Sequence, residues 1–213
     1  ADRISSMKQS SQIFRVGAPG IDTLKTVNRV SRATVAKNFS LSTSQHWMLI
    51  IMHPEPLEKK VSFKNQILSV IQAVKEFPAE KILVYPNSDT GNEVFIRYID
   101  DLASQGTIHL YPHIPRQDFI ELLQTVDVLV GNSSSGIIES IFFHLPVVNI
   151  GCRQNNREHS TNIISVDYNT DQIINAINQA LSSHFRQKCK MAKQIYGKGD
   201  TGGKIVKILE QAL

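Results

Sequence analysis

The sequence predicts an α/β fold built on a parallel sheet with helices on both faces, and two observations lead to this prediction. From residue 47 onward, apolar runs of strand length alternate with segments whose apolar residues recur at helical spacing. Several runs, such as residues 47–52, are apolar throughout, which is typical of strands buried on both faces. Strands that alternate with helices in this way form parallel sheets covered on both sides.

The composition fits one domain with a sizeable core, or a large domain with an attached arm. The chain has 213 residues, of which 41% are hydrophobic, and its mean hydropathy is -0.15. No apolar run approaches the roughly 20 residues of a membrane span, and the chain does not open with the pattern of a signal peptide. We therefore expect a cytoplasmic protein with no membrane partner, in which Cys152 and Cys189 are reduced.

The weak basic excess, a net charge of +4, indicates either an anionic ligand or nothing specific. Part of it lies in a run without acidic residues, formed by Lys25, Arg29, Arg32 and Lys37. Such a run is found in nucleic-acid-binding segments and also in solvated basic helices. No aromatic residues are interleaved and no nucleic-acid motif accompanies it, so we predict the solvated helix and no nucleic-acid partner.

The first 46 residues are predicted to form a connecting segment. The chain begins at Ala1 and is polar up to Gln12, from which we expect a piece cut from a longer protein. Residues 13–16 predict a short strand that ends in a Gly-Ala-Pro-Gly turn. Residues 23–39 predict a helix with a weak apolar stripe, and residues 41–46 predict a linker.

The predicted strands are the apolar runs at residues 47–52, 81–85, 107–111, 127–130, 146–150 and 163–166. Pro54, Pro86 and Pro112 end the first three of these, because proline cannot donate to a strand ladder. The helices between them are predicted from apolar residues that recur on one face. They lie at residues 63–77, 92–102, 116–125, 135–143, 171–181 and 204–212.

The most informative segment, residues 128–139, is an apolar strand that runs into three serines and then a helix. Backbone N–H groups at the start of a helix, with serine hydroxyls beside them, can hold a phosphate or diphosphate without a metal. Glu139, predicted one turn into the helix, would then accept hydrogen bonds from an attached ribose. The alternative is an ordinary strand–turn–helix in which serine caps the helix.

Polar residues also follow other strands, namely His53, Asn87 and His113. Ligands of open parallel sheets bind outside the carboxyl ends of the strands, so these residues and the serine turn predict one binding site. His53 would donate to a diphosphate oxygen, and Asn87 would either bind the ligand or cap the next helix. The main-chain N–H and C=O of Ile114 would match the edge of a base such as uracil, whereas His113 itself is as compatible with a turn as with a ligand.

Arg153 follows a later strand, and its guanidinium suits a phosphate. The alternative is a surface ion pair with Glu158 or a neighbour, and for Arg157 we predict such a pair. His46, His109, His144, His159 and His184 show no metal-ligand spacing. No GxxxxGK[ST] motif occurs, and the GxGxxG match at residues 197–202 (GKGDTG) follows no predicted strand. We expect neither a metal nor a cofactor.

Several of these segments resemble the UDP-N-acetylglucosamine 2-epimerase family, and most closely its hydrolysing branch, which feeds sialic acid synthesis. They are residues 130–139 (VGNSSSGIIE), residues 146–151 (PVVNIG), Arg153-Gln154 and Arg157-Glu158. His53-Pro54 and Tyr85-Pro86-Asn87 fall where that branch has similar motifs, and residues 196–200 (YGKGD) resemble the turn before its last helix. The resemblance extends from about Phe14 onward, with small departures at Ser135 and Lys198.

The resemblance implies a GT-B-type enzyme, in which two Rossmann-like halves hold a UDP-sugar between them, with this chain as the C-terminal half. Residues 1–46 would connect the halves, residues 47–195 would form the Rossmann-like UDP-binding domain, and residues 196–213 would form a C-terminal crossover helix. The full-length enzyme is implied to be a homo-oligomer. The family positions that contact UDP fall on His53, Asn87, the main chain of Ile114, Ser133, Ser134, Glu139 and Arg153, and we include the adjacent His113 among the expected UDP-binding residues.

The implied reaction is elimination of UDP from UDP-N-acetylglucosamine through a glycal, followed by addition of water to give N-acetylmannosamine. The carboxylates that act at sugar C2 come from the N-terminal half in this family, so this chain alone is expected to be inactive. His53 is the one residue here placed with the catalytic machinery. Three alternatives stay open: the non-hydrolysing epimerase, the donor-binding half of a GT-B glycosyltransferase, and a non-catalytic nucleotide-sugar sensor or interaction module.

Overall fold

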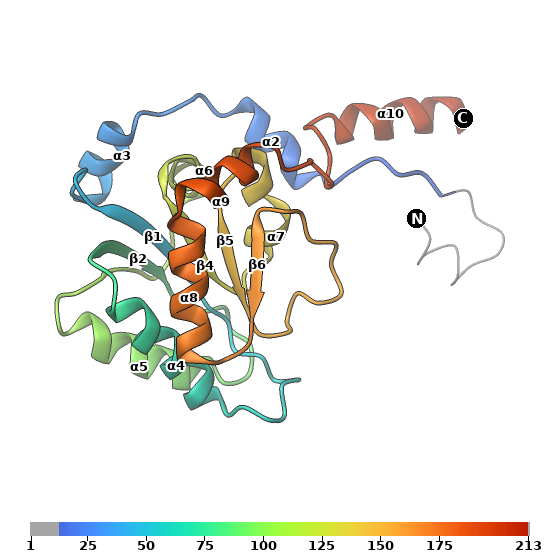
Figure 1. Cartoon of the computed structure of the whole chain (residues 1–213). Helices are drawn as coiled ribbons and strands as arrows, with labels where there is room; N and C mark the ends of the chain where they lie inside the picture. The colour runs from blue at the N-terminus through green and yellow to red at the C-terminus, as the bar shows by residue number, and fades with distance from the viewer. Residues whose placement is uncertain (1–12, 213) are drawn as a thin grey trace.

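The computed structural model describes residues 13–212, so our predictions for residues 1–12 lie outside the described range. Its centre is a six-stranded, wholly parallel sheet with the strand order β3-β2-β1-β4-β5-β6 (Figure 1). The strands are β1 (His46–Ile51), β2 (Ala79–Val84), β3 (His109–Tyr111), β4 (Val128–Gly131), β5 (Val147–Ile150) and β6 (Ile163–Val166). The predicted parallel sheet is therefore confirmed, and each strand from β1 onward starts and ends within two residues of its predicted position.

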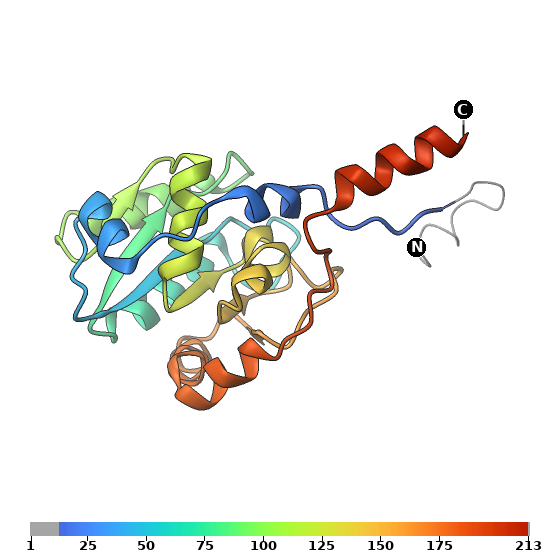
Figure 2. The same cartoon turned by 90° about the horizontal axis from the view of Figure 1, so that it is seen from above.

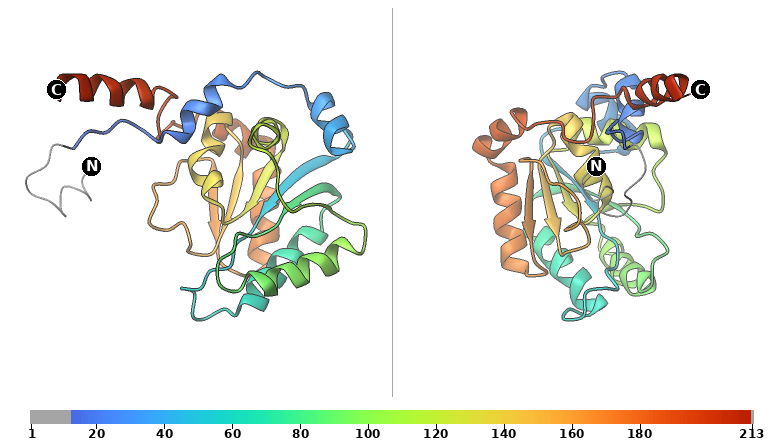
Figure 3. Two further views of the ribbon diagram at one scale, coloured as in Figure 1. Left: turned by 180° about the vertical axis from the view of Figure 1, so that it is seen from behind. Right: turned by 90° about the vertical axis from the view of Figure 1, so that its right-hand side faces the viewer.

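Helices cover both faces of this sheet, as the right-hand view of Figure 3 shows. One face carries α4 (Phe63–Lys75), α5 (Asn92–Ala103), α8 (Thr170–Leu181) and α9 (Ser183–Lys190). The opposite face carries α3 (Arg32–Phe39), α6 (Arg116–Thr125), α7 (Ser134–Ile138) and the 3-10 helix η1 (Ser140–Phe143). Outside α6 and η1 lies α2 (Gly20–Thr26), whose Ile21 and Leu24 pack on Ile120. The result is a three-layered α/β domain.

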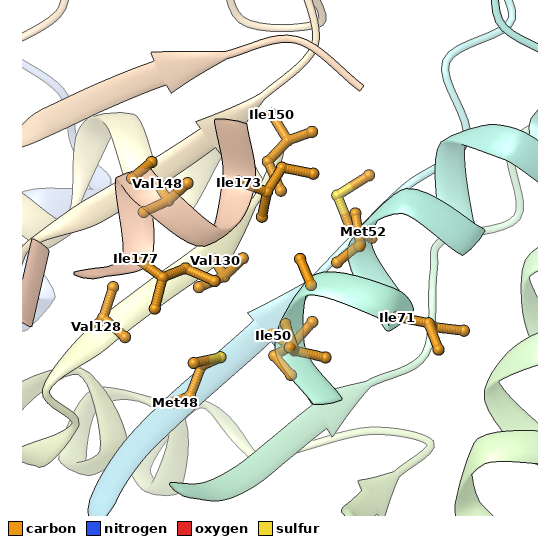
Figure 4. Packing of buried hydrophobic residues seen from close by; sticks show 14 of the residues in the cluster. Met48, Ile50, Met52, Ile71, Val128, Val130, Val148, Ile150, Ile173 and Ile177 are labelled. Carbon is orange, nitrogen blue, oxygen red and sulfur yellow. The ribbon is translucent and has the colours of Figure 1, made fainter. Parts of the chain in front are cut away.

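The alternation of β1 explains why this strand is apolar throughout. Met48 and Ile50 point into the core beneath α4 and α8, together with residues such as Ile173 and Ile177 (Figure 4). Trp47 and Leu49 point the other way, into the core beneath α3 and α6. Because both faces are covered, both alternating sets of side chains must be apolar.

Three predictions for helices and strands were wrong, and one helix was missed. Residues 13–16 form no strand, and Phe14 is exposed. The single helix predicted over residues 23–39 is two helices, α2 and α3, because the chain is already extended at Val27. The helix predicted over residues 135–143 divides into α7 and η1. Helix α9 was not predicted, since only Phe185 and Cys189 of its residues are buried.

The chain ends in α10 (Thr201–Ala212), which projects from the body at the corner where residues 13–18 also leave it (Figures 1 and 2). The carboxylate of Asp22 in α2 accepts hydrogen bonds from the first backbone N–H groups of α10, at 3.0 Å from Thr201 and 2.7 Å from Gly202. These hydrogen bonds lower the pKa of Asp22. Beyond its first turn, the helix leaves Ile205, Val206 and Leu209 exposed. In the described part of the chain, no helix is both long and apolar enough to cross a membrane.

The strand order places a topological switch point between β1 and β4, because the connections run in opposite directions from these two strands. The switch point is unusually tight at Gly131, the last residue of β4. Its φ is +139°, and a Cβ atom there would overlap the carbonyl oxygen of Ile51 in β1. Glycine is therefore required for the ends of the two strands to approach so closely.

We predict that Gly131→Ala lowers the free energy of unfolding by about 3 kcal/mol or more, because it combines a disfavoured φ with a backbone collision. Gly20→Ala is the matched control, since an added Cβ there meets no atom within 4 Å, and it should change stability by less than about 1 kcal/mol. Urea unfolding of both variants measures this. An unchanged midpoint for Gly131→Ala would contradict the close approach.

Candidate functional site

At the switch point, the side-chain amide of Asn132 joins the ends of β1 and β4. Asn132 is fully buried. Its Oδ1 accepts a hydrogen bond from the backbone N–H of His53 at 2.8 Å, and its Nδ2 donates to the carbonyl oxygen of His53, also at 2.8 Å. Its own backbone N–H donates to Ile51 at 3.1 Å. The amide thus fixes the backbone of His53 from both sides, beside the serine turn.

The imidazole of His53 is oriented by a second strand end. The backbone N–H of Asn87, after β2, donates to Nδ1 of His53 at 3.0 Å. Burial and the nearby Arg153 lower the pKa of His53 to about 4, although Asp89 opposes this shift. At neutral pH the ring is therefore uncharged, and since Nδ1 accepts a hydrogen bond, the proton resides on Nε2. His53 can offer Nε2–H as a neutral donor.

Arg153 supplies the positive charge of the site. Its guanidinium lies 3.4 Å from the carboxylate of Asp89 and donates to the carbonyl oxygen of Asn132, also at 3.4 Å. The next residue, Gln154, is buried and donates to the same carbonyl at 2.7 Å. The pKa of Asp89 is lowered by the hydrogen bond from the side chain of Asn87, and further by the hydrogen bond and the charge of Arg153. The group therefore combines one cation, one anion and a neutral imidazole.

Beneath this group, the buried carboxylate of Glu55 holds three loops together. It accepts hydrogen bonds from the thiol of Cys152 at 2.7 Å, the backbone N–H of Cys152 at 3.2 Å and the hydroxyl of Tyr168 at 2.8 Å. The hydrogen bond to Glu55, followed by burial, raises the pKa of Cys152 to about 11, and burial followed by this hydrogen bond raises the pKa of Tyr168. Both groups therefore stay protonated donors, and Glu55 fixes the loop of His53 relative to the loop of Arg153.

The serine turn follows Asn132 directly. Ser133 is the N-cap of α7, and its Oγ lies 2.8 Å from Oγ of Ser135 and 3.4 Å from the backbone N of Ser135. Ser133 and Ser134 are both partly exposed. Helix α7 has only five residues, so the hydroxyls and single N–H groups matter more here than a helix dipole.

Glu139 lies at the end of α7, as its C-cap, and not within a continuing helix as predicted. Its side chain is only 16% exposed, and both carboxylate oxygens are bound by Nη1 of Arg116, at 3.1 and 2.9 Å. The other guanidinium nitrogen of Arg116 faces α2. Arg116 thus holds the carboxylate in one orientation.

The structure thus links three of the predicted residues, His53, Asn87 and Arg153, through hydrogen bonds centred on Asn132 and Asp89. His113 is exposed and Ile114 buries its side chain beneath α3 and α6, both at the end of the edge strand β3. Among the described residues, no hydrogen bond joins the side chain of His113 to the group around Asn132. Two residues beyond Ile114, however, Arg116 contacts Glu139.

Among the described residues, Arg157 does not form the surface ion pair predicted for it, and Arg153 pairs with Asp89 and not with Glu158. Arg157 donates to the side chain of Gln154, and Glu158 faces Arg15 at 3.7 Å. In the basic run, Arg32 is not simply solvated, because it pairs with the buried Asp127 at 3.1 Å and stacks on Trp47. No cluster of three or more metal-ligating side chains occurs within residues 13–212.

Sequence reasoning missed four residues of this site: Asn132, Glu55, Asp89 and Arg116. Asn132, Glu55 and Asp89 had a sequence signal, because each lies one or two residues from a residue that was singled out for its position at a strand end. Arg116 had none, because its partner, Glu139, lies 23 residues away along the chain.

The fold and the site define a class first: a Rossmann-like α/β domain of the kind that forms one half of GT-B-type enzymes, with polar groups gathered at its switch point. A comparison with known families then identifies the chain more closely. Residues 2–210 match the model of the UDP-N-acetylglucosamine 2-epimerase family, and the chain belongs to this family.

Individual relatives agree with this assignment. The chain is 36% identical over 203 residues to a protein of Legionella pneumophila named UDP-N,N'-diacetylbacillosamine 2-epimerase (hydrolyzing), covering 95% of this chain and 52% of that protein. It is 29% identical to a UDP-N-acetylglucosamine 2-epimerase of Neisseria meningitidis, covering 82% and 46%. The chain thus spans about half the length of these curated relatives.

The fold agrees as well. The crystal structure of UDP-GlcNAc 2-epimerase from Neisseria meningitidis bound to UDP-GlcNAc superposes with a TM-score of 0.77 at 18% identity, covering 98% of this chain and 58% of that one. At this identity the likeness concerns the fold alone.

We predict that His53 makes the free energy of unfolding decrease as the pH is lowered. Its folded pKa of about 4 lies below the unfolded value of 6.5, so the stabilisation is complete above pH 6.5 and is lost as pH falls towards 4. Between pH 7 and 4, the unfolding free energy of His53→Gln should decrease by on the order of 2 kcal/mol less than that of the wild type, allowing for partial exposure of the ring. Urea unfolding between pH 7 and 4 measures it, with His184→Gln, an exposed position in α9, as control. Equal slopes for wild type and His53→Gln would contradict a neutral, buried ring.

Proposed function

We propose that this chain is the UDP-binding half of a hydrolysing sugar-nucleotide 2-epimerase. The observation that carries the proposal is the convergence at Asn132 of a neutral imidazole donor, a guanidinium and the serine turn, at the edge of the sheet where parallel α/β folds bind ligands. Family membership supports a sugar nucleotide as the ligand.

In this proposal the diphosphate of UDP contacts three groups. Nε2–H of His53 and the hydroxyls or N–H groups of Ser133 and Ser134 donate hydrogen bonds to phosphate oxygens. The guanidinium of Arg153 exchanges its long 3.4 Å contact with Asp89 for a phosphate, which accepts a stronger paired hydrogen bond. Asn87, whose backbone orients His53, lies at the same end.

The nucleoside would extend from the diphosphate towards β3. The carboxylate of Glu139 would accept hydrogen bonds from the ribose hydroxyls, and the main-chain groups of Ile114 would pair with the uracil edge, beside His113. Arg116 supports this direction, because it lies two residues after Ile114 and its side chain contacts Glu139. The proposed base contact and the proposed ribose contact are therefore close to each other. The buried side chain of Ile114 would keep its backbone in place.

The proposed reaction is elimination of UDP from C1 of the sugar, followed by addition of water that gives the 2-epimeric free sugar and UDP. This half would stabilise the negative charge that develops on the departing diphosphate. The carboxylates that act at C2 would come from the upstream half, so the described chain alone would not turn over. The hydrolysing outcome is supported by the 36% identical relative, whose name carries the word hydrolyzing.

For the sugar we propose UDP-N-acetylglucosamine, and the same Legionella relative makes UDP-N,N'-diacetylbacillosamine the competing substrate. Both sugars carry a 2-acetamido group and differ at positions C4 and C6. Those positions point away from UDP, and the residues that contact them would lie mainly in the upstream half.

The proposal extends to domain organisation. Residues 47–195 would form the UDP-binding domain, with residues 1–46 as the connection from the upstream half. Helix α10, within residues 196–213, would cross back and pack its exposed Ile205, Val206 and Leu209 on that half. The complete enzyme would be a cytoplasmic homo-oligomer.

We predict that UDP binds this chain and that Ser133→Ala, Arg153→Ala and Glu139→Ala each weaken binding. Loss of a hydrogen bond to a charged group costs about 1.5–3 kcal/mol, which corresponds to roughly tenfold to a hundredfold in Kd for Arg153 and Glu139. Isothermal calorimetry measures the affinity, and Arg97→Ala, an exposed arginine on α5, is the charge-matched control. If the folded wild-type chain binds no uridine nucleotide, the result would favour an interaction module instead.

We also predict that the full-length protein, but not this chain, releases UDP and a free 2-epimeric sugar from one of the two sugar nucleotides. Product analysis by NMR in H₂¹⁸O separates the outcomes, because the hydrolysing reaction places ¹⁸O on C1 of the free sugar. Formation of a UDP-linked epimer would support the non-hydrolysing reaction. Turnover by this chain alone would refute the proposal that catalysis requires an upstream half.

A further inference from the structure

Arg116 occupies an unfavourable place for a cation. It is the first residue of α6, a ten-residue helix, directly after Pro115. The N-terminus of a helix carries partial positive charge, so a basic residue there is disfavoured. The preceding proline has a restricted φ and fixes the direction in which the chain enters α6. The local sequence therefore offers no helical reason for arginine at this position.

The contacts of Arg116 give a different reason. Nη1 lies 3.1 and 2.9 Å from the two carboxylate oxygens of Glu139, while Nη2 lies 3.3 Å from Oγ1 of Thr23 and 3.5 Å from the carbonyl oxygen of Gly20 in α2. One planar guanidinium thus spans from the carboxylate to a second helix. Lysine, a single ammonium point charge, would not match both sets of acceptors.

The support behind Arg116 is itself fixed. Helix α2 packs Ile21 and Leu24 on Ile120 of α6, and its Asp22 caps the start of α10. The acceptors of Thr23 and Gly20 therefore form a rigid backing for the guanidinium. A carboxylate that is supported in this way loses little conformational entropy on binding a ligand.

The geometry also leaves Glu139 able to bind a ligand. A single nitrogen of Arg116 lies almost equally far from both oxygens, and a carboxylate has about four lone-pair sites. Each oxygen therefore keeps acceptor capacity on its outer side, suited to two adjacent hydroxyl groups. The Arg116 side chain is 45% exposed and that of Glu139 is 16% exposed, and an ion pair with one solvent-exposed partner contributes little to stability. The pair thus has little value for the fold.

We propose that Arg116 is a positioning residue that holds Glu139, through its bridge to α2, in the orientation that recognises the vicinal diol of the ribose. This inference rests on the proposed function, because it assumes that Glu139 binds the ribose of UDP. Arg116 does not touch the nucleotide. Its effect is selective for ligands that carry both hydroxyls.

The test compares the affinities of UDP and 2',3'-dideoxy-UDP by calorimetry for the wild type, Arg116→Gln, Arg116→Lys and Thr23→Val. Wild type should prefer UDP by about tenfold or more. Arg116→Gln should lose most of this preference while its affinity for dideoxy-UDP stays within about twofold. Arg116→Lys should recover the preference only in part, and Thr23→Val should reduce it by a few fold. A merely structural residue would weaken both ligands equally and leave the ratio unchanged.

Thermal unfolding of Arg116→Gln should show a nearly unchanged Tm, and Arg97→Gln on α5 is the matched surface-arginine control. If wild type prefers UDP and Arg116→Gln keeps that preference, the positioning role is overturned while the proposed function stands. If wild type binds both ligands equally, the ribose role of Glu139 fails, and the role of Arg116 fails with it. If it binds neither, the proposed function is overturned as well.

Discussion

The buried amide of Asn132 is the contact on which the arrangement of this sheet edge depends. It satisfies both backbone groups of His53 and, through its own carbonyl oxygen, receives Gln154 and Arg153. An amide is suited to this place because it presents a donor and an acceptor side by side. The close approach of β4 to β1 at Gly131 brings the Asn132 side chain within hydrogen-bonding distance of the His53 backbone. One residue therefore aligns the loops after β1, β4 and β5.

Charge is balanced locally around this amide, and the balance has consequences for ligand binding. Asp89 faces Arg153, and the buried Glu55 is satisfied by donors that remain protonated. His53 is neutral because burial and Arg153 oppose its protonation. The described edge therefore presents donors with little excess positive charge. Glu55 holds the loops from beneath, so the donors keep their direction without a bound anion.

The sequence predicted the strands, the parallel sheet and most helices, because a sheet covered on both faces forces apolar residues into every position of strands such as β1. It also predicted that His53, Asn87 and Arg153 lie at one edge, because the carboxyl ends of parallel strands share an edge of the sheet. It failed where only tertiary contact decides: the end of α7 at Glu139, the pairing of Arg153 with Asp89, and the break between α2 and α3. Partners separated by 64 or 23 residues leave no local pattern.

If this edge binds UDP as proposed, the neutral state of His53 bears on catalysis as well as on affinity. A protonated imidazole would attract the substrate diphosphate and the departing diphosphate alike, and would also hold the UDP product. A neutral N–H donor in a partly buried site interacts most strongly where negative charge increases during bond cleavage. The same argument applies to Arg153, because it must leave Asp89 before it can pair fully with phosphate. Both features would limit how tightly this half holds the diphosphate before and after bond cleavage, so that the UDP product can leave.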